Sequence, residues 1–185
     1  REYLDAFREL PYRGPVITGS DGVVDEPPLM IAALRPRMLE LAATSTDGTL
    51  PFLVSAARLA WMRDVLDGAV PDGRPRPVLA TTIATIVEPD AEKARTIARG
   101  WIQPYCRAIN YQNSFHEQGY GPDDWESPYS DRLIDDMVIW GDAAEVRGRI
   151  DALEAAGADH VAIIPLGADG SAEQMSVIEA LAPTA

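Results

Sequence analysis

Two arginines lie where an apolar segment gives way to a helical pattern, a position that could bind an anion. Residues 30–34 form an apolar run of strand length, and Pro36 then opens a segment with apolar residues at helical spacing. Free backbone N–H groups and the positive end of the helix dipole lie at a helix start, so Arg35 and Arg37 could hold a phosphate there. Exposed arginines are more often simply solvated, so the residues alone leave both interpretations open.

Aromatic residues gather in the segment 110–129, which we expect to form a short helix and an irregular excursion. Aromatic side chains in an irregular segment often line a pocket, although an insertion can equally pack a small core of its own. His116 lies in this segment and is therefore the better functional candidate of the two histidines. The residues do not decide between a pocket and a local core.

The chain offers no recognisable metal site and no nucleophile. His116 and His160 show no HxH or HExxH spacing, and the single Cys106 has neither a second thiol nor a histidine nearby. The carboxylates of residues 131–136 lie on a predicted helix, where such groups are usually solvated. We therefore predict no metal and leave the catalytic residue unassigned.

The elements that must position these residues alternate between strands and helices. Apolar, strand-like runs occupy residues 30–34, 49–54, 78–87 and 160–166, and we expect all four strands to be buried. Helical patterns occupy residues 2–10, 36–45, 55–67, 90–104, 131–140, 142–157 and 172–181, while residues 14–26 and 68–77 read as connecting loops. Ser55, Asp90 and Asp142 precede their helical segments as N-caps. This alternation predicts one domain with a parallel α/β sheet.

Composition excludes several classes of partner. The 185 residues carry a formal net charge of −13, which opposes binding to nucleic acid or to an anionic membrane surface. No run approaches the roughly 18 apolar residues of a membrane span. Neither GxGxxG nor a Walker A sequence occurs. With one cysteine, the chain fits a reducing cytoplasm, so we expect a cytoplasmic protein whose partner is a small molecule.

Four blocks of sequence resemble one known family. In chain order they are IAALRPRMLELAATSTDGTLPFLV, VLATTIATIVEPDAEKARTIA, NYQNSF and WGDAAEVRGRIDALEAAGADHVAIIPL. They resemble the carboxy-terminal part of the luciferase-like monooxygenase superfamily, and most closely its deazaflavin (coenzyme F420)-dependent oxidoreductases. The resemblance implies a (β/α)8 TIM barrel of the bacterial luciferase type, with residues 1–185 as the carboxy-terminal portion of one barrel domain. Because a full barrel takes about 250 residues, we expect only strands 5–8 here, with strands 1–4 missing.

The resemblance also implies an activity. It is the transfer of a hydride between coenzyme F420 and a small organic substrate, carried out by the full-length chain, with the fragment alone inactive. An FMN-dependent monooxygenase that uses reduced flavin and oxygen is the alternative, and a non-catalytic binding or structural relative is a second one. Relatives are often dimers, so a homodimer is expected.

The resemblance carries over to particular residues in three segments. The loop that helps hold the cofactor in relatives corresponds to Ala33, Leu34, Arg35, Pro36 and Arg37, and relatives often have glycine where Arg35 stands. At the end of the next strand, Pro51 and Phe52 would approach the cofactor or the substrate. In the excursion, Tyr111 and Asn113 would contact the substrate, with His116 beside them. Most proton donors of relatives would belong to the missing half.

Overall fold

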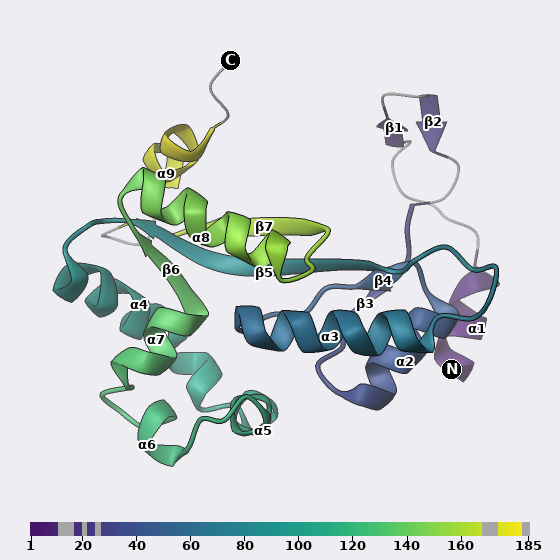
Figure 1. Cartoon of the computed structure of the whole chain (residues 1–185), viewed down its shortest axis with the longest axis horizontal. Coiled ribbons are helices and arrows are strands. Elements are labelled where there is room, and N and C mark those ends of the chain that lie inside the picture. The colour runs from purple at the N-terminus through teal and green to yellow at the C-terminus, as the bar shows by residue number, and fades with distance from the viewer. Residues whose placement is uncertain (11–16, 20–21, 25–26, 168–173, 183–185) are drawn as a thin grey trace.

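A parallel sheet built around one long strand organises the protein. The computed structural model describes residues 1–10, 17–19, 22–24, 27–167 and 174–182 (Figure 1). The sheet consists of β3 (Met30–Ile31), β4 (Gly48–Thr49), β5 (Val78–Val87), β6 (Val138–Gly141) and β7 (His160–Pro165), and every pairing in it is parallel. β5 is a run of mostly β-branched residues, which favour strands, and it spans the sheet from end to end.

The two edges of β5 are used differently. β7 pairs with residues 80–85 along one edge. Thr82 pairs with Ala162 of β7 and also forms an isolated bridge with Phe52, so Phe52 must lie at the opposite edge. β6 continues along that second edge, because Ala84 pairs with both β6 and β7. The chain segment that follows β4 is thereby placed directly before β6.

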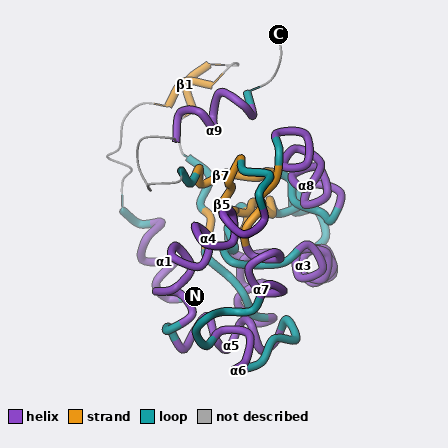
Figure 2. Tube along the Cα trace, turned by 90° about the vertical axis from the view of Figure 1, so that its left-hand side faces the viewer, coloured by secondary structure: helices purple, strands orange, loops and turns teal. Residues whose placement is uncertain are grey.

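Nine helices accompany the sheet in the described part of the chain. They are α1 (Glu2–Arg8), α2 (Pro36–Ser45), α3 (Ala56–Ala69), α4 (Ala91–Cys106), α5 (Ile109–Glu117), α6 (Pro122–Trp125), α7 (Asp131–Met137), α8 (Ala143–Ala155) and α9 (Gln174–Leu181). Figures 1 and 2 show α5 and α6 together at one extremity of the molecule, far from α9. None of these helices has the length and apolar composition of a membrane span in the described part of the chain.

The predicted N-caps are confirmed. The Ser55 hydroxyl accepts a hydrogen bond from the Arg58 backbone N–H, and the Asp90 carboxylate accepts two from the first turn of α4. Asp142 and Glu145 form a reciprocal capping box at the start of α8. These local signals fix where the helices that flank the strands begin.

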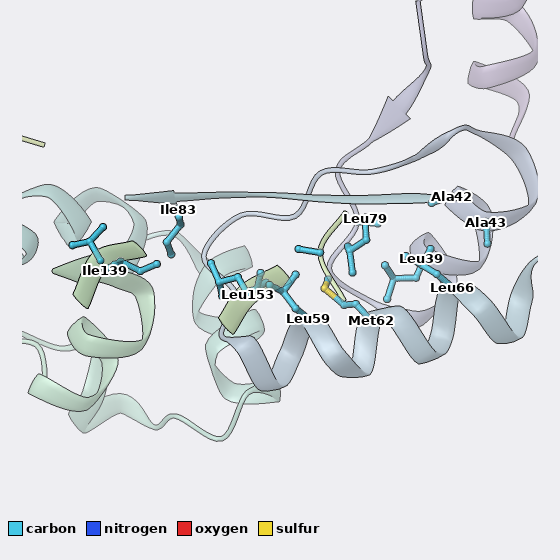
Figure 3. Close-up of a cluster of buried hydrophobic side chains, with 14 residues drawn as sticks. Leu39, Ala42, Ala43, Leu59, Met62, Leu66, Leu79, Ile83, Ile139 and Leu153 are labelled. Carbon is cyan, nitrogen blue, oxygen red and sulfur yellow. The ribbon is translucent and has the colours of Figure 1, made fainter. Parts of the chain in front are cut away.

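Two hydrophobic clusters fill the space between the helices and the sheet. The first packs α2 and α3 against the first part of β5 and is aliphatic; Figure 3 shows Leu59, Met62 and Leu66 of α3 facing Leu79 of β5. The second lies under α4, α5 and α7 and is rich in aromatic residues, with Phe115 fully buried at 0% exposure. The first cluster contains Leu79, Ile83 and Val87 of β5 and the second contains Ala84 and Ile86, so the two clusters lie on opposite faces of the strand.

The structure corrects two predicted elements. The helix predicted at residues 131–140 ends at Met137, and Val138–Gly141 is instead strand β6, because these residues pair with residues 84–87 of β5. The predicted loop 14–26 contains an antiparallel pair, β1 (Ile17–Gly19) and β2 (Gly22–Val24). Long-range pairing decides the first case, and local periodicity cannot reveal it.

Three strands differ from their predicted length or burial. β3 keeps only two residues of the predicted 30–34, and they are half-buried. The predicted strand 49–54 reduces to β4 and the bridge at Phe52. β7 is confirmed at residues 160–165 but is not fully buried. Among the described strands, β3 and β7 lie at the two ends of the sheet and do not pair with each other, so the sheet is open and its end strands are partly exposed.

The predicted start of the last helix, at residue 172, lies outside the described residues.

Candidate ligand-binding site

The loops after β3 and β4 lie side by side at the carboxyl edge of the sheet. The Ile31 carbonyl accepts hydrogen bonds from the Leu50 backbone N–H at 3.2 Å and from the Thr49 hydroxyl at 2.8 Å. In parallel α/β sheets, ligands bind beyond this edge of the strands. Residues that leave the two strands here are therefore the first candidates for a ligand site.

The loop after β3 leads directly into α2. Ala33 is buried at 2% exposure and Leu34 is half-buried, whereas Arg35 is exposed and serves as the N-cap residue of α2, with Pro36 in the first turn. Arg35 has φ −128° and ψ 156°, an extended conformation that any residue adopts. The arginine therefore causes no backbone strain at the position where relatives often carry glycine.

The two arginines of this loop have different surroundings. Arg35 Nε lies 3.2 Å from Glu117 Oε1 at the end of α5, and Arg58 Nη2 of α3 lies 2.6 Å from the other carboxylate oxygen. Arg37 is exposed and lines a separate shallow depression with Arg1 and other residues of α2. The structure therefore does not bring Arg35 and Arg37 together at one anion site, and Arg58 takes the place beside Arg35.

Phe52 lies in an aromatic wall that we define as Phe52, Trp101, Tyr105 and Tyr111, all half-buried. Its ring centroid lies 5.9 Å from that of Trp101, 5.2 Å from that of Tyr105 and 6.1 Å from that of Tyr111, in edge-to-face geometry. The adjacent Pro51 is buried, and its carbonyl accepts a hydrogen bond from the Thr82 N–H. Two residues 59 positions apart in sequence, Phe52 and Tyr111, are thus in contact.

The other residues of α5 divide between its two faces. Asn113 and His116 are exposed. Ser114 and Phe115 are buried, and Phe115 extends the aromatic packing from Tyr111 to the rings beyond it. The aromatic side chains of the excursion therefore pack in the second hydrophobic cluster together with α4 and α7, and Tyr111 adds one side of the aromatic wall.

Gln118 ties α5 to the loop after β4. Its Oε1 accepts a hydrogen bond from the Ser55 N–H at 2.9 Å, and its Nε2 donates to the Leu53 carbonyl at 3.2 Å. Leu53 has φ 56°, a left-handed conformation that is rare for a residue with a large side chain. Non-glycine residues in this conformation persist where the surroundings hold them, and they concentrate at functional sites.

An open depression of about 320 Å³, which we call the α3–α5 depression, adjoins these contacts. It is lined by Ser55, Ala57, Arg58, Trp61, Glu117 and Gln118. Of these residues only Ser55 was predicted from the sequence, as the N-cap of α3. The spacing of Arg58 and Trp61, three apart on a helix, could have suggested their contact, whereas nothing local marks Glu117 or Gln118.

Burial raises the pKa of two groups in or next to the aromatic wall, Cys106 and Tyr111. Burial raises the pKa of the Cys106 thiol to about 11, which keeps it protonated and unreactive at neutral pH. Burial, and then the neighbouring Tyr105, raises the pKa of Tyr111. In the described residues no group of three or more His, Cys, Asp or Glu side chains could hold a metal ion.

The open parallel sheet with its candidate residues at the carboxyl edge is the architecture of a barrel-type α/β protein. Residues 1–160 match the model of the luciferase-like monooxygenase family, so the chain belongs to that family. No curated protein matches the chain significantly. The fold class expected from the sequence is confirmed, with the barrel not closed in the described residues.

Solved structures with the same fold share little sequence with this chain. One is an F420-dependent secondary alcohol dehydrogenase in complex with an F420–acetone adduct (19% identity, TM-score 0.61, covering 98% of this chain). Others are the coenzyme F420-dependent tetrahydromethanopterin reductase from Methanopyrus kandleri (17%, 0.57, 86%) and apo-MsnO8 (18%, 0.58, 99%). The chain spans 61%, 52% and 61% of these proteins, respectively.

Proposed function

We propose that this protein is an oxidoreductase in which coenzyme F420, a deazaflavin, exchanges a hydride with a small organic substrate. Membership of the luciferase-like monooxygenase family supports a redox enzyme, and two structures of similar fold are those of F420-dependent enzymes. One observation carries the proposal. Arg35 and Phe52, which follow two different strands, both contact α5, Arg35 through Glu117 and Phe52 through Tyr111, so three separate parts of the chain come together at one edge of the sheet.

The residues at this edge fit the chemistry of a deazaflavin. Such a cofactor has a flat ring system and an anionic tail. The aromatic wall offers apolar ring faces and edges to the first part. For the second part, the guanidinium groups of Arg35 and Arg58 share the single carboxylate of Glu117, and Arg58 Nε is buried without an acceptor in the described residues.

When bound, the deazaflavin supplies or accepts the hydride, and the chain's own residues position it and exclude water. Phe52 would hold the ring through packing, and Arg35 would bind an anionic group at the start of α2. α5 covers this edge, and Gln118 keeps it attached to the loop after β4. Asn113 and His116 lie on the solvent-exposed side of α5, so they would contact only a substrate that binds on that side of the helix.

The test is a fluorescence titration of the full-length protein with oxidised deazaflavin and, in parallel, with FMN. Preferential binding of the deazaflavin supports the proposal, and Phe52→Ala and Arg35→Met should then each weaken it by about tenfold or more. Arg107→Met, an exposed residue after α4, is the matched control. Preference for FMN would instead assign a flavin-dependent monooxygenase, and binding of neither would favour a non-catalytic relative.

A further inference from the structure

The α3–α5 depression has a fixed cation at its base. The Arg58 side chain is only 10% exposed, and its Cζ lies 3.8 Å from the centroid of the Trp61 ring. Its Nη2 donates to the Leu34 carbonyl and to Glu117 Oε2, both at 2.6 Å. Its Nε is buried and has no acceptor in the described part of the chain. The guanidinium is thus held in one place with hydrogen-bonding capacity unused.

The charge around this cation is unbalanced. Arg35 and Arg58 both pair with Glu117, so two positive charges share one negative charge. This local excess occurs in a chain with a formal net charge of −13. Ala57 belongs to the first turn of α3, directly after the N-cap residue Ser55, and the positive end of the helix dipole there also favours an anion.

Glu117 has the position and the freedom of a replaceable carboxylate. It is the last residue of α5, and its side chain is 34% exposed. Rotation into solvent would free the Arg58 and Arg35 guanidinium groups without breaking a buried contact of α5. Gln118, the next residue, would keep α5 in place through its bonds to Ser55 and Leu53.

We propose that the α3–α5 depression binds the carboxylate or phosphate group of a small ligand, and that Glu117 occupies this position until the ligand replaces it. The incoming group accepts hydrogen bonds from Arg58 and Arg35 in place of Glu117. The site follows from its own geometry. Only the statement that the group belongs to the substrate or to the tail of the deazaflavin rests on the proposed function.

Calorimetric titration of the full-length protein with inorganic phosphate and with acetate, at constant ionic strength, tests the site. Arg58→Met should weaken binding of phosphate by about tenfold or more, because a charge-assisted hydrogen bond is lost. Glu117→Gln should strengthen it by about tenfold, because the competing carboxylate is gone. The matched control, Arg107→Met, should bind phosphate like the wild-type protein.

A second pair of variants covers the case in which Arg58→Met does not fold. Ala57 is exposed at the rim of the depression. Ala57→Glu adds a negative charge there without removing any contact and should weaken phosphate binding, whereas Ala57→Gln adds similar bulk without charge and should not. Unchanged phosphate affinity in Ala57→Glu, or no gain in Glu117→Gln, overturns the proposal.

The two sources of the anionic group are separated by competition. If phosphate lowers the apparent affinity for the deazaflavin, the depression holds the cofactor's tail. If phosphate binds equally well to the protein saturated with deazaflavin, the group belongs to the substrate. Phosphate binding needs no cofactor, so a failure of the deazaflavin titration would leave this test intact.

Discussion

Helix α3 carries two arginines, Arg58 and Arg63, whose side chains are only 10% and 7% exposed and reach opposite edges of the sheet. Arg63 reaches the amino edge, where its Nη2 donates to the Pro77 carbonyl at 3.0 Å and its guanidinium lies 3.2 Å from Asp67 and 3.4 Å from Asp159. Arg76 pairs with the same two carboxylates. Two positive charges therefore meet two negative charges, and the amino edge is electrically balanced.

The carboxyl edge is built in the opposite way. There Arg58 and Arg35 share the single carboxylate of Glu117, and an open depression adjoins them. The two faces of the sheet differ as well: the cluster that contains α2 and α3 is mostly aliphatic, whereas the cluster that contains α5 is rich in aromatic rings. In barrel enzymes the amino face supports stability and the carboxyl face holds ligands, and the role that we propose for Arg58 agrees with this division.

The largest effect is expected where the aromatic cluster is most buried. Phe115 is 0% exposed and its ring packs against those of Tyr111, Tyr120 and Trp125. Phe115→Ala should lower the free energy of unfolding by about 3–5 kcal/mol, because it opens a cavity among these rings. Urea denaturation measures this, with the exposed Phe7→Ala as control. A loss as small as that of the control would mean that α5 contributes little to the core.

A smaller loss is expected from breaking the balanced network. Arg63→Met should lower the free energy of unfolding by about 2–4 kcal/mol, because it leaves the Pro77 carbonyl and two carboxylates without their shared partner. Arg76→Met, in which the replaced side chain is 56% exposed, should cost less than about 1 kcal/mol. Equal losses in the two variants would contradict the view that the buried Arg63 stabilises the fold more than the exposed Arg76 does.

Gln118→Leu tests the link between α5 and the loop after β4. We expect a loss of about 1–2 kcal/mol in the free energy of unfolding, since the Ser55 N–H and the Leu53 carbonyl both lose their partner. Hydrogen exchange at the Ser55 N–H should accelerate more than exchange in β5. Gln103→Leu, at an exposed position of α4, is the control. Uniform acceleration in both places would show that Gln118 stabilises the whole fold and not this link.

The smallest effect is expected in the pH dependence of the amino edge. A hydrogen bond from Arg76, followed by the charges of Arg63 and Arg76, lowers the pKa of Asp67 below its ordinary value, against the opposing effect of burial. Its contribution to stability is therefore present at neutral pH and is lost as the pH falls below about 4. Asp67→Asn should have a lower free energy of unfolding than the wild-type protein at pH 7, and urea denaturation at pH 3 should show a smaller difference between the two proteins. An equal difference at both pH values would exclude this linkage.

Local chemistry made much of the fold predictable. β5 was predicted with its observed boundaries because β-branched residues fill it, and the caps at Ser55, Asp90 and Asp142 were predicted because their side chains act within three residues. β6 was predicted as helix, since four residues gain strand geometry only by pairing with β5. Burial of β3 and β7 was overestimated for the same reason, because burial depends on neighbours that a strand's own residues do not specify.

The candidate site shows the same division. The sequence by itself predicted that Arg35 follows one strand, and the family resemblance put Phe52 at the end of the next, which places both toward the carboxyl edge of a parallel sheet. Only the tertiary structure separated Arg37 from Arg35 and brought Arg58, Glu117 and Gln118 beside the loops. The physical reason is the sequence separation over which the interactions act. Caps and strand preferences act between near neighbours in the chain, whereas the charge balance of a site depends on side chains that folding brings together from distant segments.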